Sequence, residues 1–411
     1  MKQTIKSIRW VVLALVAGAL LGLNFPDTAL IFSPVTKFLL QLIKAAATPL
    51  VFFAVMEAIL RHRVAGGDFF RLLVVTLING GIAISIGLLV ANIFEPGQYL
   101  AFLGGDVTAA TPNIDFLDML AQQLPTSVVQ PLADNSIMPV VVMAVAFGFA
   151  WRHVRARQTA DAASLMDSGE AWVSFAREMC ETLLIWIVKL IPFAVFAATA
   201  KVTAEHGLHP FTGLGQYVGL CMLGMAIHVA FTYSAWLLLF VRVSLRTFWR
   251  YAIEPVVYAF GVNSSLVTLP LTLRALDQLG ISRRASTLAA VVGTNLNNDG
   301  IILYEGFTLL ALAQAGGIEM SLATQIFAAL YCIVAAMGVA GVPEAGIVAL
   351  TLVLGGLGIP VEALGLLLSV DWILARSRSL MNTTSDMVGS MILNRWIELG
   401  APQKPAVTPH I

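Results

Sequence analysis

Charged residues are scarce in this chain of 411 residues. Asp, Glu, Lys and Arg together make up 12% of it, hydrophobic residues make up 58%, and the mean hydropathy is +0.85. In a typical soluble domain the charged fraction is about 25%. This shortage of charge excludes an ordinary soluble domain and predicts an all-α integral membrane protein in a lipid bilayer.

An excess of either charge is also lacking, because 24 basic residues balance 24 acidic ones, and no basic run is interleaved with aromatic residues. This argues against a nucleic-acid partner. Cysteine is rare: Cys180, Cys221 and Cys332 lie in apolar segments without a CxxC pair, which favours packing over disulfides or zinc. No HExxH or GxSxG motif occurs. We therefore expect neither a membrane enzyme nor a resident cofactor.

Apolar runs in the first part of the chain predict six membrane spans, at about residues 10–25, 38–60, 72–94, 137–151, 172–200 and 217–240. Basic residues cluster after the second, fourth and sixth runs, whereas residues 96–134 contain four Asp and neither Lys nor Arg. Because basic loops stay in the cytoplasm, the alternation predicts a cytoplasmic N-terminus and an outer loop at 96–134.

Beyond Arg250 the apolar runs are interrupted by small and polar residues. Residues 258–276 contain Gly261, Asn263 and Pro270, and residues 325–359 contain four glycines or prolines within AAMGVAGVPEAG. Irregular backbone at membrane depth is tolerated only where protein or a hydrated cavity surrounds it, and paired interruptions point to a transporter's binding region. We predict two re-entrant helical hairpins.

Between the two hairpins, the segment GTNLNNDGIILYEG at residues 293–306 interrupts what would otherwise be a seventh span. Its amide and carboxylate side chains are Asn295, Asn297, Asn298, Asp299 and Glu305. Lipid does not accept this density of polar groups, so the segment is unwound or faces a cavity. Its backbone carbonyls and carboxylates suit Na⁺ better than a transition metal. The alternative is a structural role in which the amides bridge the helix to a hairpin.

A polar stripe follows near the C-terminus, on an eighth span. Asp371, Arg378, Asn382 and Asp386 are spaced by seven, four and four residues, which places them with Ala375 on one helix face. Ionisable groups at membrane depth are expensive unless paired or hydrated, so the stripe indicates a binding site. A structural Arg–Asp pair, or a helix end with snorkelling charges, is the alternative.

Seven segments, taken in order, resemble the dicarboxylate/amino acid:cation symporter family: LIKAAATPLVFFAV (42–55), FEPG (94–97), LPTSVVQPLADNSIMPVVVMAVAFG (124–148), SSLVTLP (264–270), NNDG (297–300), AGVPEAG (340–346) and residues 371–386. The resemblance implies an elevator-type protomer of eight transmembrane helices and two re-entrant hairpins in a homotrimer, in a bacterial inner membrane. It also implies a scaffold subdomain at about 10–60 and 124–210, a transport subdomain at about 66–97 and 211–399, and a C-terminal tail at 400–411.

The same resemblance assigns roles to individual residues. The implied substrate-binding residues are Ser264, Ser265, Ile301, Val342, Gly346, Ala375, Arg378 and Asn382. The implied Na⁺ sites are Asp386 with Gly293, Asn297 and Asn382; Asp299 with Asn297; and Ala336, Met337 and Val339 with Asn295. Glu305 stands where some members carry a proton, and a carboxyl group in poorly hydrated surroundings favours its protonated form.

Several positions depart from the family pattern. Ala375 replaces the Asp that pairs with a substrate ammonium in amino acid transporters, and Ile301 replaces a Thr. Thr76, Asn79 and Gly80 stand where the third helix supplies ligands for the Asp299 site, and Asn263 replaces a common Arg or Ser.

These residues predict a symporter that takes up a C4 dicarboxylate with Na⁺ and, through Glu305, H⁺. A Na⁺-coupled symporter of aspartate or glutamate is the alternative, and a passive anion channel is a remote one.

Overall fold

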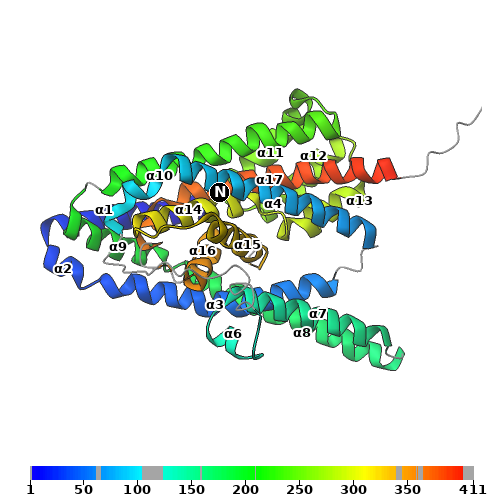
Figure 1. The fold of residues 1–411 in the computed structure, drawn as a ribbon, viewed down its shortest axis with the longest axis horizontal. Coiled ribbons are helices and arrows are strands. Elements are labelled where there is room, and N and C mark those ends of the chain that lie inside the picture. The colour runs from blue at the N-terminus through cyan, green and yellow to red at the C-terminus, as the bar shows by residue number, and fades with distance from the viewer. Residues whose placement is uncertain are drawn as a thin grey trace, which may run out of the picture.

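The computed structural model describes residues 2–61, 66–103, 124–157, 160–208, 210–338, 345–357, 359 and 364–400. Within these residues the regular structure is helical and includes no strand, which confirms the all-α prediction (Figure 1). Most of the predicted outer loop, from 104 to 123, and the tail from 401 to 411 lie outside the described residues.

One group of helices comes from the N-terminal half of the chain. Its members are α1 (Lys2–Asn24), α2 (Pro26–Leu30), α3 (Ser33–Arg61), α6 (Gln130–Ala133), α7 (Ile137–Arg157), α8 (Ala160–Val188) and α9 (Ile191–His206). The long helix α3 packs against α7, α8 and α9, and α1 packs against α9. Many large apolar side chains on these helices are exposed, as expected for surfaces that face lipid.

A second group surrounds α17. It comprises α4 (Gly66–Phe94), η1 (Pro96–Leu103), α10 (Pro210–Ile227), η2 (His228–Tyr233), η3 (Trp236–Val241), α11 (Leu245–Val262), α12 (Ser265–Gln278), α13 (Arg283–Ser286), η4 (Thr287–Val292), η5 (Gly293–Asn295), α14 (Asp299–Ala315), α15 (Leu322–Gly338), α16 (Ala345–Gly356) and α17 (Leu364–Gly400). In Figure 1, α15 and α16 lie between α3 on one side and α14 and α17 on the other, and both helices contact α3 and α14.

The first predicted interruption is confirmed as a tight break between α11 and α12. Helix α11 ends at Val262, and its C-cap residue Asn263 has a left-handed φ of 55°, a conformation that Asn tolerates better than most residues. Ser264 then caps α12, because its hydroxyl oxygen accepts a hydrogen bond from the Val267 N–H at 3.2 Å. Pro270 lies inside α12 and does not end it.

The predicted interruption of the seventh span is confirmed as well. The π-helix η4 and the 3₁₀-helix η5 are followed by residues 296–298 outside regular helix, and α14 then begins at Asp299. Nearly all of α14 is buried, including Asp299 and Glu305, so its polar groups face protein and not lipid. This buried interruption brings backbone and side-chain oxygens together.

The predicted fifth span, 172–200, is bent in the structure. The structure divides it into α8 and α9, whose axes bend by 42°. Pro192 at the start of α9 explains the break, because proline lacks the N–H that a continuous helix needs.

Three described helices are long and apolar enough to cross a membrane, Pro26–Glu57, Gly67–Phe94 and Pro210–Val241, or four if the bent pair counts as one span. Helix α14, which has 17 residues, and helix α17, which carries the charged stripe, are not among them.

Candidate functional site

The centre of the polar stripe on α17 is a buried ion pair. The Arg378 guanidinium donates to both carboxylate oxygens of Asp371, with Nη1–Oδ1 at 2.7 Å and Nη2–Oδ2 at 3.0 Å. The two side chains are only 3% and 4% exposed. The Arg378 Cζ also lies 4.2 Å from the centre of the Tyr304 ring on α14, a cation–π contact. The Arg–Asp pair considered above as a structural alternative therefore exists, at the centre of the predicted substrate site.

Two glycines allow other backbone segments to approach this arginine. A Cβ atom on Gly346 of α16 would lie 2.7 Å from the Arg378 Cζ, and one on Gly300 of α14 would lie 2.7 Å from the Arg378 backbone oxygen. Neither distance leaves room for a methyl group. Helices α14, α16 and α17 consequently meet at Arg378, and the predicted residues Gly346 and Arg378 lie side by side.

Asn382 connects the stripe to the unwound segment. Its Oδ1 accepts a hydrogen bond from the Gly300 N–H at 2.8 Å, and its Nδ2 donates to Asn298 Oδ1 at 3.3 Å. Asn298 in turn donates to the backbone oxygen of Ala336 on α15 at 3.3 Å. This chain of hydrogen bonds brings α17, the interruption before α14 and the end of α15 together.

Asp386 is surrounded by groups that suit a sodium ion. Thr294 donates to its Oδ2 at 2.8 Å and Asn297 Nδ2 donates to its Oδ1 at 3.3 Å. The Oδ1 of Asn297 is buried without a hydrogen-bond partner among the described residues. Carboxylate, hydroxyl and amide oxygens within the water-poor interior are the ligands that hard cations prefer. The oxygen atoms of Asp386, Thr294 and Asn297 could therefore serve as ligands for Na⁺. Thr294 is a member of this group that the sequence analysis missed.

Asp299 has different neighbours. Its Oδ2 accepts hydrogen bonds from Ser385 at 2.6 Å and from the Tyr233 hydroxyl at 3.0 Å, and the His228 Nε2 lies 3.5 Å away. Asp299 and His228 are both fully buried. Sequence analysis missed all three partners, because the sequence does not show which side chains of other helices lie opposite Asp299. The Asn297 side chain, predicted to share this site, hydrogen bonds Asp386 instead.

The first interruption also reaches the stripe. Ser379 on α17 donates to the Oδ1 of Asn263 at 3.1 Å, which fixes the junction of α11 and α12 beside Arg378. Ser264 acts as the cap of α12, and Ser265 follows as its first residue. Ser264 and Ser265 therefore directly follow Asn263, the residue whose side chain contacts the stripe.

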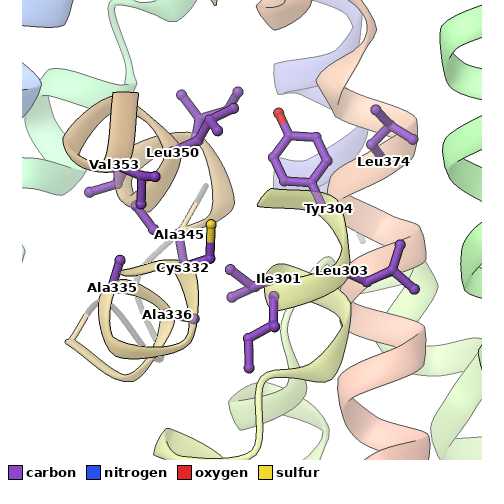
Figure 2. Close-up of a cluster of buried hydrophobic side chains, with 14 of the residues drawn as sticks. Ile301, Leu303, Tyr304, Cys332, Ala335, Ala336, Ala345, Leu350, Val353 and Leu374 are labelled. Atoms are coloured by element: carbon purple, nitrogen blue, oxygen red, sulfur yellow. The ribbon is translucent and has the colours of Figure 1, made fainter. Parts of the chain in front are cut away.

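Apolar side chains of α14 and α15 face one another in the same region. Figure 2 shows Ile301 directed from α14 towards Cys332 and Ala336 on α15. Ala375 is buried on α17, with 3% of its surface exposed. Glu305 is fully buried on α14, and neither carboxylate oxygen has a hydrogen-bond partner among the described residues. Ile301, Ala375 and Glu305 thus lie in the protein interior.

The remaining predicted ion and hairpin positions are placed only in part. Val339 and Val342 lie outside the described residues. Asn295 is the last residue of η5, and Met337 lies near the end of α15. Gly293 begins η5, and its backbone oxygen accepts hydrogen bonds from Leu296 and Asn297, each at 2.8 Å.

Comparison with known proteins decides the family. The model of the sodium:dicarboxylate symporter family matches residues 8–396, nearly the whole chain. The chain belongs to the sodium:dicarboxylate symporter family. It is therefore a multi-pass membrane transporter and not an enzyme, as the sequence analysis predicted.

Curated members of the sodium:dicarboxylate symporter family are similar over nearly their full length. The chain is 28% identical over 403 residues to C4-dicarboxylate transport protein 3 of Ralstonia nicotianae, covering 94% of this chain and 88% of the relative. It is 25% identical over 401 residues to the C4-dicarboxylate transport protein of Bacillus subtilis, covering 93% and 91%. It is 24% identical over 413 residues to the proton/sodium-glutamate symport protein of Bacillus subtilis, covering 95% and 92%.

The close approach of α16 to Arg378 gives a test of the binding region. Gly346→Ala should weaken substrate binding by about tenfold or more, because the added methyl group displaces the guanidinium. Gly261→Ala is the matched control, since a Cβ there meets nothing within 4 Å. Substrate-dependent thermal stabilisation of the purified protein measures both variants. Equal stabilisation of the two variants would show that Arg378 does not contact substrate.

Proposed function

We propose that the chain is a secondary symporter that takes up a small dicarboxylate together with Na⁺. The observation that carries this proposal is Arg378, a buried guanidinium at the meeting point of α14, α16 and α17. A guanidinium offers five N–H donors in a planar fork that matches a carboxylate, and a dry pocket strengthens such bonds. Asp371 uses two of these donors, and a substrate carboxylate would compete for the others or replace Asp371.

The residues around Arg378 favour a C4 dicarboxylate over an acidic amino acid. Ala375 is buried on the same face of α17, where it offers no partner for a substrate ammonium. Burial of an ammonium without a partner costs several kcal/mol. The apolar side chain of Ile301 adds no hydroxyl donor. The similarity to C4-dicarboxylate transport proteins agrees with this preference, whereas the glutamate symport relative keeps aspartate or glutamate as the alternative.

Sodium would bind at Asp386, where carboxylate, hydroxyl and amide oxygens lie close together. The orphaned Oδ1 of Asn297 supports this assignment, since an ion would satisfy a buried oxygen that has no other partner among the described residues. The backbone oxygen of Ala336, which Asn298 already reaches, is the described part of a second candidate position at the end of α15. The Ala336 position is connected through Asn298 and Asn382 to Gly300, which lies beside the Arg378 backbone, so an ion there would be coupled to the substrate site.

The arrangement of helices supports an elevator mechanism. Helices α1, α3, α7, α8 and α9 pack mainly on one another, and α4, α10, α11, α12, α14 and α17 do the same. We assign them to a scaffold, about 10–60 and 124–210, and a transport subdomain, about 66–97 and 211–399. In this assignment the protomer has eight spans with hairpins at α11–α12 and α15–α16, and forms a homotrimer in a bacterial inner membrane with its N-terminus in the cytoplasm.

Uptake in proteoliposomes tests this function. Entry of labelled succinate should require external Na⁺ and fall to background when choline replaces Na⁺ at constant pH. Unlabelled succinate inside the vesicles should drive counterflow, because a carrier moves substrate in both directions from one bound state. Uptake unchanged in choline contradicts sodium coupling. Flux without counterflow indicates a passive anion channel.

Ala375→Asp tests the substrate preference. The introduced carboxylate supplies the missing partner for an ammonium, so aspartate should gain about tenfold over succinate in competition for uptake, about 1.4 kcal/mol. Ala375→Ser, which is similar in size and uncharged, should keep the order of the wild type. The substrate assignment is wrong if wild-type protein already prefers aspartate by about tenfold.

Glu305 supports proton-assisted uptake. Its carboxyl group is fully buried on α14, and its oxygens have no hydrogen-bond partner among the described residues. A charged carboxylate is unfavourable in such surroundings, so a proton taken up from one side can be carried and released where the group meets water. Arg378 and Cys332 are its titratable neighbours.

Glu305→Gln tests the proton carrier. At fixed Na⁺, uptake by the wild type should increase when the outside is more acidic than the inside, and the variant should transport with little such increase. Glu319→Gln, the same change at an exposed residue, is the control. If the wild type and Glu305→Gln respond equally to the pH gradient, Glu305 does not carry the proton.

A further inference from the structure

Three arginines surround the turn that joins η3 to α11. The apolar span Pro210–Val241 ends directly before Arg242, whose left-handed backbone, with a φ of 63°, turns the chain. Arg246 and Arg250 follow in the first part of α11, four residues apart, so their side chains are neighbours on one face of the helix. All three arginines are exposed. The turn therefore concentrates positive charge at the end of an apolar span.

None of these three arginines forms an ion pair with a carboxylate among the described residues. The arginines of α13, in the same group of helices, do form such pairs: Arg283 contacts Asp277 at 2.6 Å, and Arg284 contacts Asp68. Glu254, the first acidic residue of α11, is exposed and pairs with none of the three arginines. The described part of the protein thus leaves the positive charge of this turn open to an anion from outside.

Apolar side chains on both sides of the turn indicate its depth in the bilayer. Leu239 on η3, three residues before the first arginine, is 78% exposed, and Ile253 on α11, three residues after the last one, is 51% exposed. Large apolar side chains that are exposed on a transmembrane segment face lipid. The chain therefore leaves the hydrocarbon region after Leu239 and enters it again at Ile253. The arginines between them lie at the level of the lipid headgroups, where Trp249 and Tyr251, both half-buried, are also typical residues.

We propose that Arg242, Arg246 and Arg250 bind the phosphate group of an anionic phospholipid. A guanidinium donates paired hydrogen bonds to phosphate oxygens, and two guanidiniums one helical turn apart can hold one phosphate from two sides. Each arginine near an anionic lipid surface strengthens binding about fivefold. The exposed side chains of Leu239 and Ile253 would contact the acyl chains of the same lipid, which a soluble phosphate ion lacks. Because the first hairpin begins at this turn, the lipid holds the start of α11 at the membrane surface.

Lipid titration of the purified full-length protein tests this site. The melting temperature is followed in a neutral detergent, at fixed Na⁺ and pH, while phosphatidylglycerol or phosphatidylcholine with the same acyl chains is added. Phosphatidylglycerol should raise the melting temperature of the wild type more than phosphatidylcholine does. In the double variant Arg246→Gln and Arg250→Gln, the midpoint for phosphatidylglycerol should rise by about tenfold or more, because two guanidiniums are lost. Arg283→Gln, the same change at an exposed arginine that already pairs with Asp277, is the matched control and should stay within about twofold of the wild type.

Glycerol 1-phosphate separates a complete lipid from a free phosphate group, because it carries the phosphate without acyl chains. At the concentration at which phosphatidylglycerol saturates, it should stabilise the wild type little, and equal stabilisation would show that the turn binds a soluble phosphate compound instead of a lipid. Equal midpoints for the wild type and the double variant, or equal responses to the two lipids, would also overturn the proposal. If the double variant melts below the wild type without lipid, the single variants Arg246→Gln and Arg250→Gln replace it, and each should raise the midpoint about fivefold. None of these measurements involves transport, so their result is independent of the proposed substrate and of sodium coupling.

Discussion

A buried guanidinium held by one carboxylate determines how the binding region is arranged. Arg378 and Asp371 lie on the same helix, two turns apart, and both are withdrawn from water. Removal of one member of such a pair costs about 3–5 kcal/mol, because the other charge stays buried alone. The pair therefore fixes the position of the Arg378 side chain. Tyr304 covers one face of the guanidinium, and the bare backbone of Gly346 limits the space beside it.

This constraint explains why the surrounding helices are interrupted. A continuous α-helix satisfies its own backbone groups and leaves few of them for a neighbour. The interruption at residues 296–298 exposes the N–H of Gly300 and the amide of Asn298 to Asn382, and the break at Asn263 exposes a side-chain oxygen to Ser379. Each irregular segment thus has a polar contact on α17. Stability at the site comes from contacts between broken segments and one unbroken helix.

The sequence predicted where the helices are interrupted better than it predicted which side chains contact the polar residues. Interrupted apolar runs indicated the breaks at Asn263 and before Asp299, because polar and small residues at membrane depth need a structural reason. Helical spacing correctly placed Arg378 and Asp371 on one face. It could not identify Thr294, Ser385 or Tyr233 as partners, since periodicity shows which face is polar and not which helix lies opposite. The bend at Pro192 was missed because one proline at the end of a long apolar run does not reveal whether the helix continues.

The surroundings of Asp299 show why such partners depend on helix geometry. His228 and Tyr233 are five residues apart, and in an α-helix of 3.6 residues per turn they would point about 140° away from each other. The structure places both in the π-helix η2, in which residues i and i+5 are hydrogen-bonded and lie on nearly the same face. Only this wider turn lets the two rings touch and both reach Asp299. The π-helix thus brings the Tyr233 hydroxyl and the His228 ring to one carboxylate. Asp386 accepts its hydrogen bonds from Thr294 of η5 and from the Asn297 amide instead. The different partners of these two aspartates follow from the local backbone opposite each of them.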